Sequence, residues 1–325
     1  MVALFLGIGL ALWYLIDVLL LAFAAILLAV ALRGLSTRLQ RRIGGAAGLS
    51  LAIVVLLLIA AVGLVFWAFG SQVAAQYDEI VQRAPAGMAA IAVHLRAHPL
   101  SGYLIDHLKG FSISDATGPI ASMAARAIGS TLQGLTYAVF AIFGGIYLAV
   151  DPDRYRAGAL RLFPPAYRPR LAQVLEASGR ILEKWLLGQL VVMATIGTLS
   201  GLGLWALGID AAFALGLTGG LLCFVPFVGA ILAAVPATLM AFSQSPLEAA
   251  YTVLLFMGIH FIEGNFITPM VQDEAVALPP VISVFSTLVF TMLFGPFAVI
   301  VAVPITIVGL VLLKMLYVED TLGEA

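Results

Sequence analysis

The sequence predicts an all-α, polytopic integral membrane protein, and two observations predict it. First, 62% of the 325 residues are hydrophobic and 10% are charged, whereas charged residues make up about a quarter of ordinary soluble proteins. Second, the segment from Trp185 to Leu313 contains no Lys or Arg. A bilayer accepts so long an apolar run as several helices of about 20 residues in series.

Residues 1–69 are expected to form the N-terminal membrane helices. Met1–Leu32 is apolar apart from Asp17, which favours two short helices that meet near this residue. The segment lacks the basic leader of a cleavable signal peptide, so we expect it to remain in the membrane. Leu49–Phe69 is an uninterrupted apolar segment of about one membrane thickness and the clearest single span.

Most of the 16 basic residues fall in two clusters, which we interpret as short loops at residues 33–42 and 151–184. Positive charge marks the cytoplasmic side of bacterial membrane proteins, so both loops should face the cytoplasm. Residues 70–126 alternate polar and apolar side chains at helical spacing, which predicts a small helical insertion on the outer face. Residues 127–150 then return across the membrane, and residues 151–184 form a basic amphipathic segment along the inner surface.

Residues 185–317 are expected to form a C-terminal membrane core, followed by a tail at residues 318–325. Two apolar stretches in this core, Ala211–Phe242 and Pro280–Leu316, are too long for one span each. Each contains a Gly/Pro interruption, so each is interpreted as two half-segments joined by a break that lines a transport pathway. The residues concerned are Pro226 and Gly229 in the first stretch and Gly295 and Pro296 in the second. Ordinary proline kinks in two long helices are the alternative.

Glu263 is the strongest candidate for a functional side chain, because it is a carboxylate in a stretch that is otherwise almost entirely apolar. Ionisable groups inside membranes mark proton relays and ion pathways. His260 lies three residues earlier, on the same face of a helix, where it could share a proton with Glu263. The alternative is that both side chains only pack and hydrogen-bond neighbouring helices.

Three further polar or helix-breaking residues follow Glu263. Asn265 and Thr268 precede Pro269, which is expected to break the helix and to free carbonyl oxygens that can bind a monovalent cation or a polyol. The alternative is an interfacial helix end with capping residues. Gln189, early in a span, is a second candidate, and its alternative is a hydrogen bond that joins two helices.

Several function classes have no supporting motif in this sequence. The single cysteine, Cys223, excludes an intrachain disulfide and a Cys-based metal cluster. We found no Ser-His-Asp arrangement, phosphate-cradling loop or paired acid motif, so an enzyme is not expected. We expect no cofactor, no metal and no nucleic-acid partner.

Four motifs in the core resemble the autoinducer-2 exporter family of bacterial membrane transporters, also described as predicted permeases. They are Gly188-Gln189-Leu190; Val225-Pro226-Phe227-Val228-Gly229 with Ala234-Val235-Pro236; Glu263-Gly264-Asn265 through Pro269; and Leu293-Phe294-Gly295-Pro296 with Ala302-Val303-Pro304. The resemblance implies about eight membrane segments, a homo-oligomer in the bacterial inner membrane, and export of autoinducer-2 or antiport of sodium or lithium against protons.

Together these features predict a secondary membrane transporter with a pathway lined by broken helices and an intramembrane Glu263. Its partners would be a small solute, or a monovalent cation and protons, and the lipid bilayer. The alternative is a non-transporting membrane scaffold or a channel-like oligomer.

Overall fold

The computed structural model describes residues 15–60, 63–64, 67, 136–226, 228–271, 278–295 and 297–323. Across these ranges all regular structure is helical. Four helices within them are long and apolar enough to cross a membrane: Ile16–Ile43, Pro165–Ala206, Pro246–Met270 and Ala298–Leu322. The prediction of an all-α polytopic membrane protein is confirmed, whereas the predicted outer-face insertion at 70–126 lies outside the described residues.

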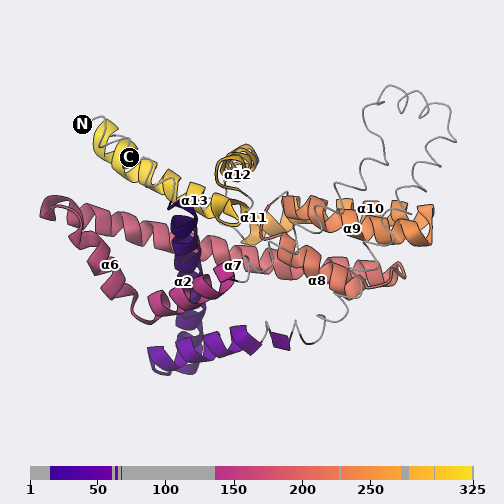
Figure 1. Cartoon of the computed structure of the whole chain (residues 1–325), viewed down its shortest axis with the longest axis horizontal. Coiled ribbons are helices and arrows are strands. Elements are labelled where there is room, and N and C mark those ends of the chain that lie inside the picture. Colours follow the sequence, from indigo (N-terminus) through magenta and orange to yellow (C-terminus); the bar gives the residue numbers. More distant parts are fainter. Residues whose placement is uncertain are drawn as a thin grey trace.

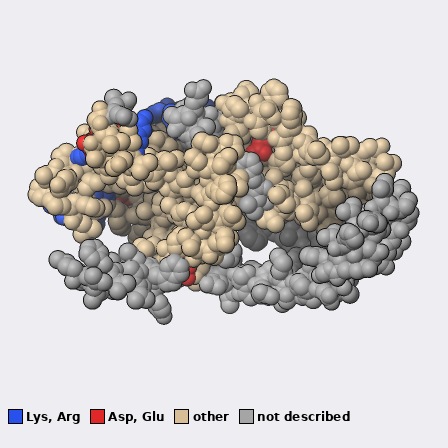
Figure 2. All heavy atoms as spheres, turned by 90° about the horizontal axis from the view of Figure 1, so that it is seen from above, with Lys and Arg blue, Asp and Glu red and all other residues tan. Residues whose placement is uncertain are grey.

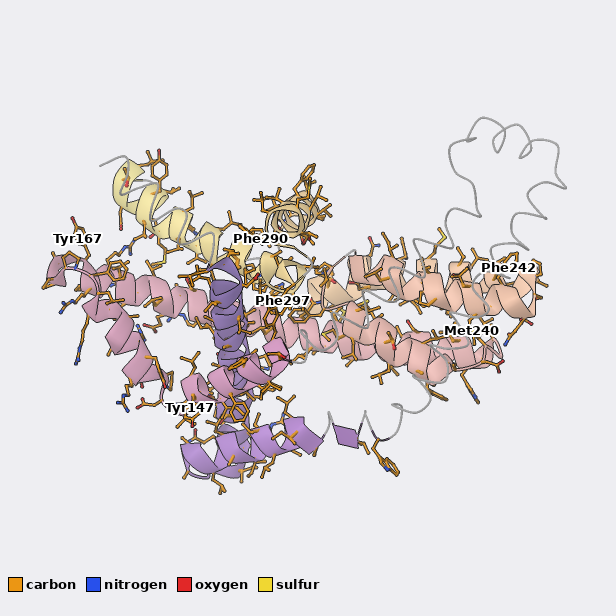
Figure 3. The ribbon with its side chains drawn as sticks, in the orientation of Figure 1. Tyr147, Tyr167, Met240, Phe242, Phe290 and Phe297 are labelled. Atoms are coloured by element: carbon orange, nitrogen blue, oxygen red, sulfur yellow. The ribbon has the colours of Figure 1, made fainter. Side chains whose placement is uncertain are left out.

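Helix α7 (Arg168–Ala206) is the central element of the molecule. Its 39 residues give a length of about 58 Å at 1.5 Å per residue, nearly twice the hydrocarbon core of a bilayer. It runs along the long axis, from the end where Tyr167 lies toward the end where Phe242 lies (Figures 1 and 3). The predicted boundary between residues 184 and 185 falls inside this helix, because good helix formers continue across it without a proline.

Helix α2 (Ile16–Ile43) crosses α7 (Figure 1) and corrects the prediction of a loop at residues 33–42. The arginine-rich segment is helical to its end, where Gly44 adopts a left-handed conformation with φ 71° and its N–H donates to the Gln40 carbonyl. Asp17 lies in the first turn, where a negative charge complements the helix dipole. The predicted partner helix before Asp17 falls in residues that the structure leaves undescribed.

The two basic clusters lie close together in space. Arg33 of α2 donates to the carbonyl oxygen of Val150 at 3.1 Å, at the end of the helix Thr136–Val150. The next helix, α6 (Pro152–Arg161), begins there and is capped by Asp151. In Figure 2 the blue side chains gather over the end of the molecule that holds α6 and the start of α7. Such proximity is what a shared cytoplasmic side requires, and that side itself remains a prediction.

Helix α8 (Ala212–Leu222) packs on the second half of α7 through glycines, which allow two backbones to approach closely. A Cβ added to Gly220 would lie 2.7 Å from the carbonyl oxygen of Met193 and 2.8 Å from the Cα of Gly197. A Cβ added to Gly216 would meet the backbone of Gly201. Helices α9 (Val228–Gln244) and α10 (Pro246–Ile262) complete this side of the molecule around a core that includes Leu204 and Phe256.

The predicted interruptions are confirmed in both long stretches. Helices α8 and α9 are separate elements that flank Pro226. Helices α12 (Pro280–Phe294) and α13 (Ala298–Leu312) flank Gly295, which has φ 81°. Pro236 and Pro304 lie inside helices and do not end them. The presence of a proline alone therefore does not determine where these helices end.

The guanidinium group of Arg170, near the start of α7, binds the C-terminal π-helix η3 (Leu313–Leu322). Arg170 donates to Glu319 at 2.9 Å, to Asp320 at 2.9 Å and to the carbonyl oxygen of Met315 at 2.7 Å. These contacts join the end of the described chain to the polar half of α7.

The glycine contact between α7 and α8 predicts that Gly216→Ala destabilises the protein. The added methyl group has only backbone atoms to displace, and overpacking of this kind costs about 1–3 kcal/mol. We expect a lower unfolding temperature in detergent, measured by intrinsic fluorescence. Gly258→Ala in α10 is the matched control because a Cβ there meets no atom within 4 Å. Equal unfolding temperatures for the two variants would contradict the close approach of these helices.

Candidate functional site

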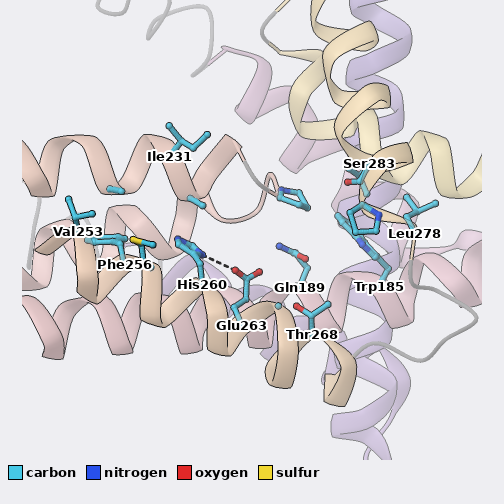
Figure 4. A pocket seen from close by; sticks show the side chains of 17 residues that line it. Trp185, Gln189, Ile231, Val253, Phe256, His260, Glu263, Thr268, Leu278 and Ser283 are labelled. Atoms are coloured by element: carbon cyan, nitrogen blue, oxygen red, sulfur yellow. Dashed lines mark hydrogen bonds and ion pairs between the residues drawn. The ribbon is translucent and has the colours of Figure 1, made fainter. Parts of the chain in front are cut away.

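A pocket of about 640 Å³ lies where α7, the α8–α9 break, α10, α12 and α13 meet. Its wall is mostly apolar and aromatic, with a few polar side chains (Figure 4). The polar lining residues are Gln189, His260, Glu263, Thr268 and Ser283. Pockets of about 300–1,000 Å³ with mainly apolar walls and a few placed polar groups are typical small-molecule sites.

His260 and Glu263 form a hydrogen-bonded pair in the wall of this pocket. The Nδ1 atom of His260 lies 2.8 Å from Oε2 of Glu263, as their spacing of three residues predicts. Both side chains are largely buried, with exposed fractions of 22% and 26%. The other ring nitrogen of His260, Nε2, is buried without a hydrogen-bond partner among the described residues. The pair therefore has an unused polar atom in addition to the shared proton site.

The helix that carries this pair widens at Glu263. Residues Glu263–Ile267 form the π-helix η2, in which the N–H of Thr268 donates to the carbonyl of Glu263, five residues back. Single π turns of this kind are frequent at functional sites. The widening places Glu263, Gly264 and Thr268 on the pocket wall. Sequence reasoning placed the irregularity at Pro269 instead.

Pro269 does not break the helix. It lies in α11 (Thr268–Val271), which continues directly from η2. The π turn ahead of it provides the altered backbone path, so the proline follows the irregular turn rather than creating it. Asn265 is exposed and donates from Nδ2 to the carbonyl of Phe261 at 2.8 Å. Neither Asn265 nor Pro269 lines the pocket.

Gln189 joins α7 to the break between α8 and α9. Its side chain is 3% exposed, and Nε2 donates to the carbonyl oxygen of Cys223 at 2.6 Å. This carbonyl lies just past the end of α8. Gln189 also lines the pocket beside Glu263 and Thr268 (Figure 4). The hydrogen bond agrees with the interpretation of Gln189 as a link between helices, and its role in a site stays a prediction.

Of the remaining predicted site residues, one lines the pocket and the others do not or are not described. Pro226, in the α8–α9 break, lines the pocket. Gly229 is buried in the first turn of α9, with its backbone against Leu222, where a side chain would not fit. Gly295 ends α12 away from the lining residues. Pro296 falls outside the described residues.

The sequence did not single out most of the apolar lining residues, and it also missed Trp185 and Ser283. Trp185 contributes an aromatic wall from α7, and Ser283 contributes a hydroxyl from α12. A usable signal for Ser283 was present, because Ser283, Thr287 and Thr291 recur every four residues in a helix whose other residues, apart from Ser286, are apolar. Trp185 carries no comparable signal, since aromatic residues also face lipid. No group of three His, Cys, Asp or Glu that could hold a metal lies together among the described residues.

The fold and the pocket define an integral membrane protein whose broken helices border a pocket with an ionisable pair in its wall. The sequence matches the AI-2E family transporter profile over residues 2–317, so the chain belongs to this family. The family match also agrees with the prediction that the protein is not an enzyme.

Curated relatives are similar over parts of the chain. The putative transport protein YrrI of Bacillus subtilis is 28% identical over 50% of this chain and 46% of its own length. The putative transport protein YueF of the same organism is 23% identical over 53% of this chain and 51% of its own. The AI-2 transport protein TqsA of Escherichia coli is 29% identical over 37% of this chain and 36% of its own. The chain thus spans about half the length, or less, of these relatives.

The bond from Gln189 to the α8–α9 break predicts the reactivity of Cys223, the single cysteine, which is buried. Gln189→Leu leaves the Cys223 carbonyl without its partner, and an unsatisfied buried acceptor costs about 1–3 kcal/mol. We expect a membrane-permeant maleimide to modify Cys223 severalfold faster in this variant. Gln244→Leu, at the exposed end of α9, is the control and should keep the parental rate. An unchanged rate in Gln189→Leu would show that the bond does not hold the break closed.

Proposed function

We propose that this protein is a secondary transporter that exports a small solute in exchange for protons, with Glu263 and His260 as the coupling pair. The observation that carries the proposal is the 2.8 Å contact between His260 and Glu263 in the wall of a pocket of about 640 Å³. The membership of the chain in a transporter family supports it. We infer a location in the bacterial inner membrane, with the basic segments at residues 33–42 and 151–184 on the cytoplasmic side.

The pair offers two charge states for such an exchange. With one shared proton the pair is neutral overall, either as imidazolium and carboxylate or as imidazole and carboxylic acid. After loss of that proton it carries one negative charge. A solute that donates hydrogen bonds, or that carries a positive charge, then takes the place of the proton at Glu263. Return of a proton to the pair weakens this contact and favours release.

The charge of the pocket limits the solute class. Among the described residues that line the pocket, Glu263 is the acidic one and none is Lys or Arg. An anionic solute would meet the carboxylate with no basic side chain to balance it, which is costly where the surroundings are apolar. The pocket therefore favours a neutral or cationic solute with an apolar part. The AI-2 in the name of the relative TqsA is one solute to test.

A monovalent cation is the second candidate cargo. The Glu263 carboxylate and the Thr268 hydroxyl line the same pocket, and oxygen ligands suit hard cations. A bare ion would fill little of about 640 Å³. For this reason the volume favours the organic solute.

Glu263→Gln tests the coupling role, because glutamine keeps the size and hydrogen bonding of glutamate without its charge. In proteoliposomes with an imposed pH gradient, we expect solute, sodium or lithium flux to fall at least about tenfold, in the range of proton-transfer effects. Solute exchange between equal pH on both sides should persist. Asp210→Asn, an exposed carboxylate in the turn between α7 and α8, is the control. Absence of gradient-driven flux in the parent protein would support a scaffold instead.

His260→Gln tests whether the histidine shares the proton. Glutamine can still donate to Glu263 but cannot carry a proton at neutral pH, so we expect flux to remain while its pH dependence narrows to the titration of one group. The measurement is the rate of solute flux in proteoliposomes from pH 5 to pH 8, the range in which histidine titrates. An identical pH profile for parent and variant would assign His260 a packing role only.

A further inference from the structure

A second cavity, of about 590 Å³, lies apart from the pocket, between α2, the helix Ala47–Ala60 and α7. Its walls are leucine side chains, among them Leu35, Leu57 and Leu190, which are 37%, 60% and 42% exposed. This exposure leaves the cavity open on the outer surface of the helices, where a membrane protein meets lipid.

Two arginines of α2 close one end of this groove. Arg38 and Arg42 both line it, and their spacing of four residues places them on one face of the helix. Both are exposed, and no described acidic residue pairs with either of them. Other arginines of the chain do have partners: Arg33 donates to Val150, and Arg170 binds Glu319 and Asp320.

An alternative explanation for the two arginines is the helix dipole. They lie in the last turns of α2, where positive charge is favourable. The dipole does not explain why an apolar groove leads away from them. A ligand with a negative head and an apolar body satisfies both features, since guanidinium groups bind phosphate oxygens through paired hydrogen bonds.

We propose that this groove binds one anionic phospholipid, with its phosphate group at Arg38 and Arg42 and an acyl chain along the leucines. Basic pockets between membrane helices on the cytoplasmic side are suited to such head groups, and this end of α2 is the predicted cytoplasmic end. A free phosphate ion would use the arginines and leave the apolar walls uncovered. The geometry therefore favours the lipid.

The test is native mass spectrometry of the purified full chain in detergent with phosphatidylglycerol or phosphatidylcholine of identical acyl chains. We expect one phosphatidylglycerol to be retained in preference to phosphatidylcholine, and inorganic phosphate at millimolar concentration not to displace it. Equal retention of the two lipids, or displacement by inorganic phosphate, would overturn the proposal. These measurements need no variant.

Three variants separate a built site from general surface charge. Arg38→Gln with Arg42→Gln should lower the affinity for phosphatidylglycerol by about tenfold or more, because each substitution removes a charge-assisted hydrogen bond to the phosphate. Arg154→Gln with Arg161→Gln in α6 removes the same charge outside the groove and should leave the affinity unchanged. Leu57→Trp keeps the arginines and fills the groove, so it should also weaken binding. Full affinity in Leu57→Trp, or equal losses in both arginine pairs, would refute the site.

Discussion

The structure depends on the requirement that backbone N–H and C=O groups inside a membrane find partners within the protein. Regular helices meet it by themselves, and three irregular segments in the C-terminal half show how the chain meets it elsewhere. After α8 the carbonyl of Cys223 accepts the side-chain amide of Gln189. In η2 the wider turn still bonds Thr268 to Glu263. At Gly295 the N–H donates to Thr291 at 2.9 Å. Each irregular segment is thus satisfied locally, and the first two border the same pocket.

Because charged groups are scarce in this part of the chain, the His260–Glu263 pair has a large effect on the charge of the pocket wall. In a soluble protein a histidine beside a glutamate is one ion pair among many, and water weakens it. Here no Lys or Arg lies between Trp185 and Leu313, so no basic side chain of that segment compensates Glu263. A change of one proton on the pair alters the net charge of the pocket wall. Thr268 and Gln189 provide neutral hydrogen-bonding groups beside it, which can orient a solute without fixing its charge.

Features that depend on nearby residues could be predicted from the sequence, whereas features that depend on contacts between distant segments could not. Helix type and the two interruptions follow from composition and from Pro226 and Gly295, which act on their own backbone, so they could be predicted. The pair of His260 and Glu263 follows from helical spacing. The continuity of α7 through residues 184 and 185 could not be predicted from charge, because a helix can leave the membrane without ending.

The pocket itself was harder to predict, because its walls come from segments distant in the sequence. Ser283 joins the pocket from α12, which is distant in the sequence from the other polar lining residues. Gly264 and Pro269 signalled an irregular backbone near Glu263, but they did not specify a π turn. Pro269 was expected to break the helix. The chain instead widens into a π turn just before Pro269 and then continues as α11. Gly229, in contrast, is required by tertiary packing against Leu222, which the sequence motif suggested without its cause.

Helix α7 connects these environments. Successive residues of a helix point about 100° apart, and Gln189 lines the pocket while Leu190 lines the groove that reaches Arg38 and Arg42. About two to three turns further along α7, Gly197 and Gly201 pack against α8. Because α7 has no break in its 39 residues, these three surfaces keep a fixed spacing along one rod. The irregular wall of the pocket, at Pro226 and at Glu263–Ile267, belongs instead to segments packed against that rod. The helix therefore supplies a regular wall of the site, and segments with irregular backbone at Pro226 and at Glu263–Ile267 supply further parts of its wall.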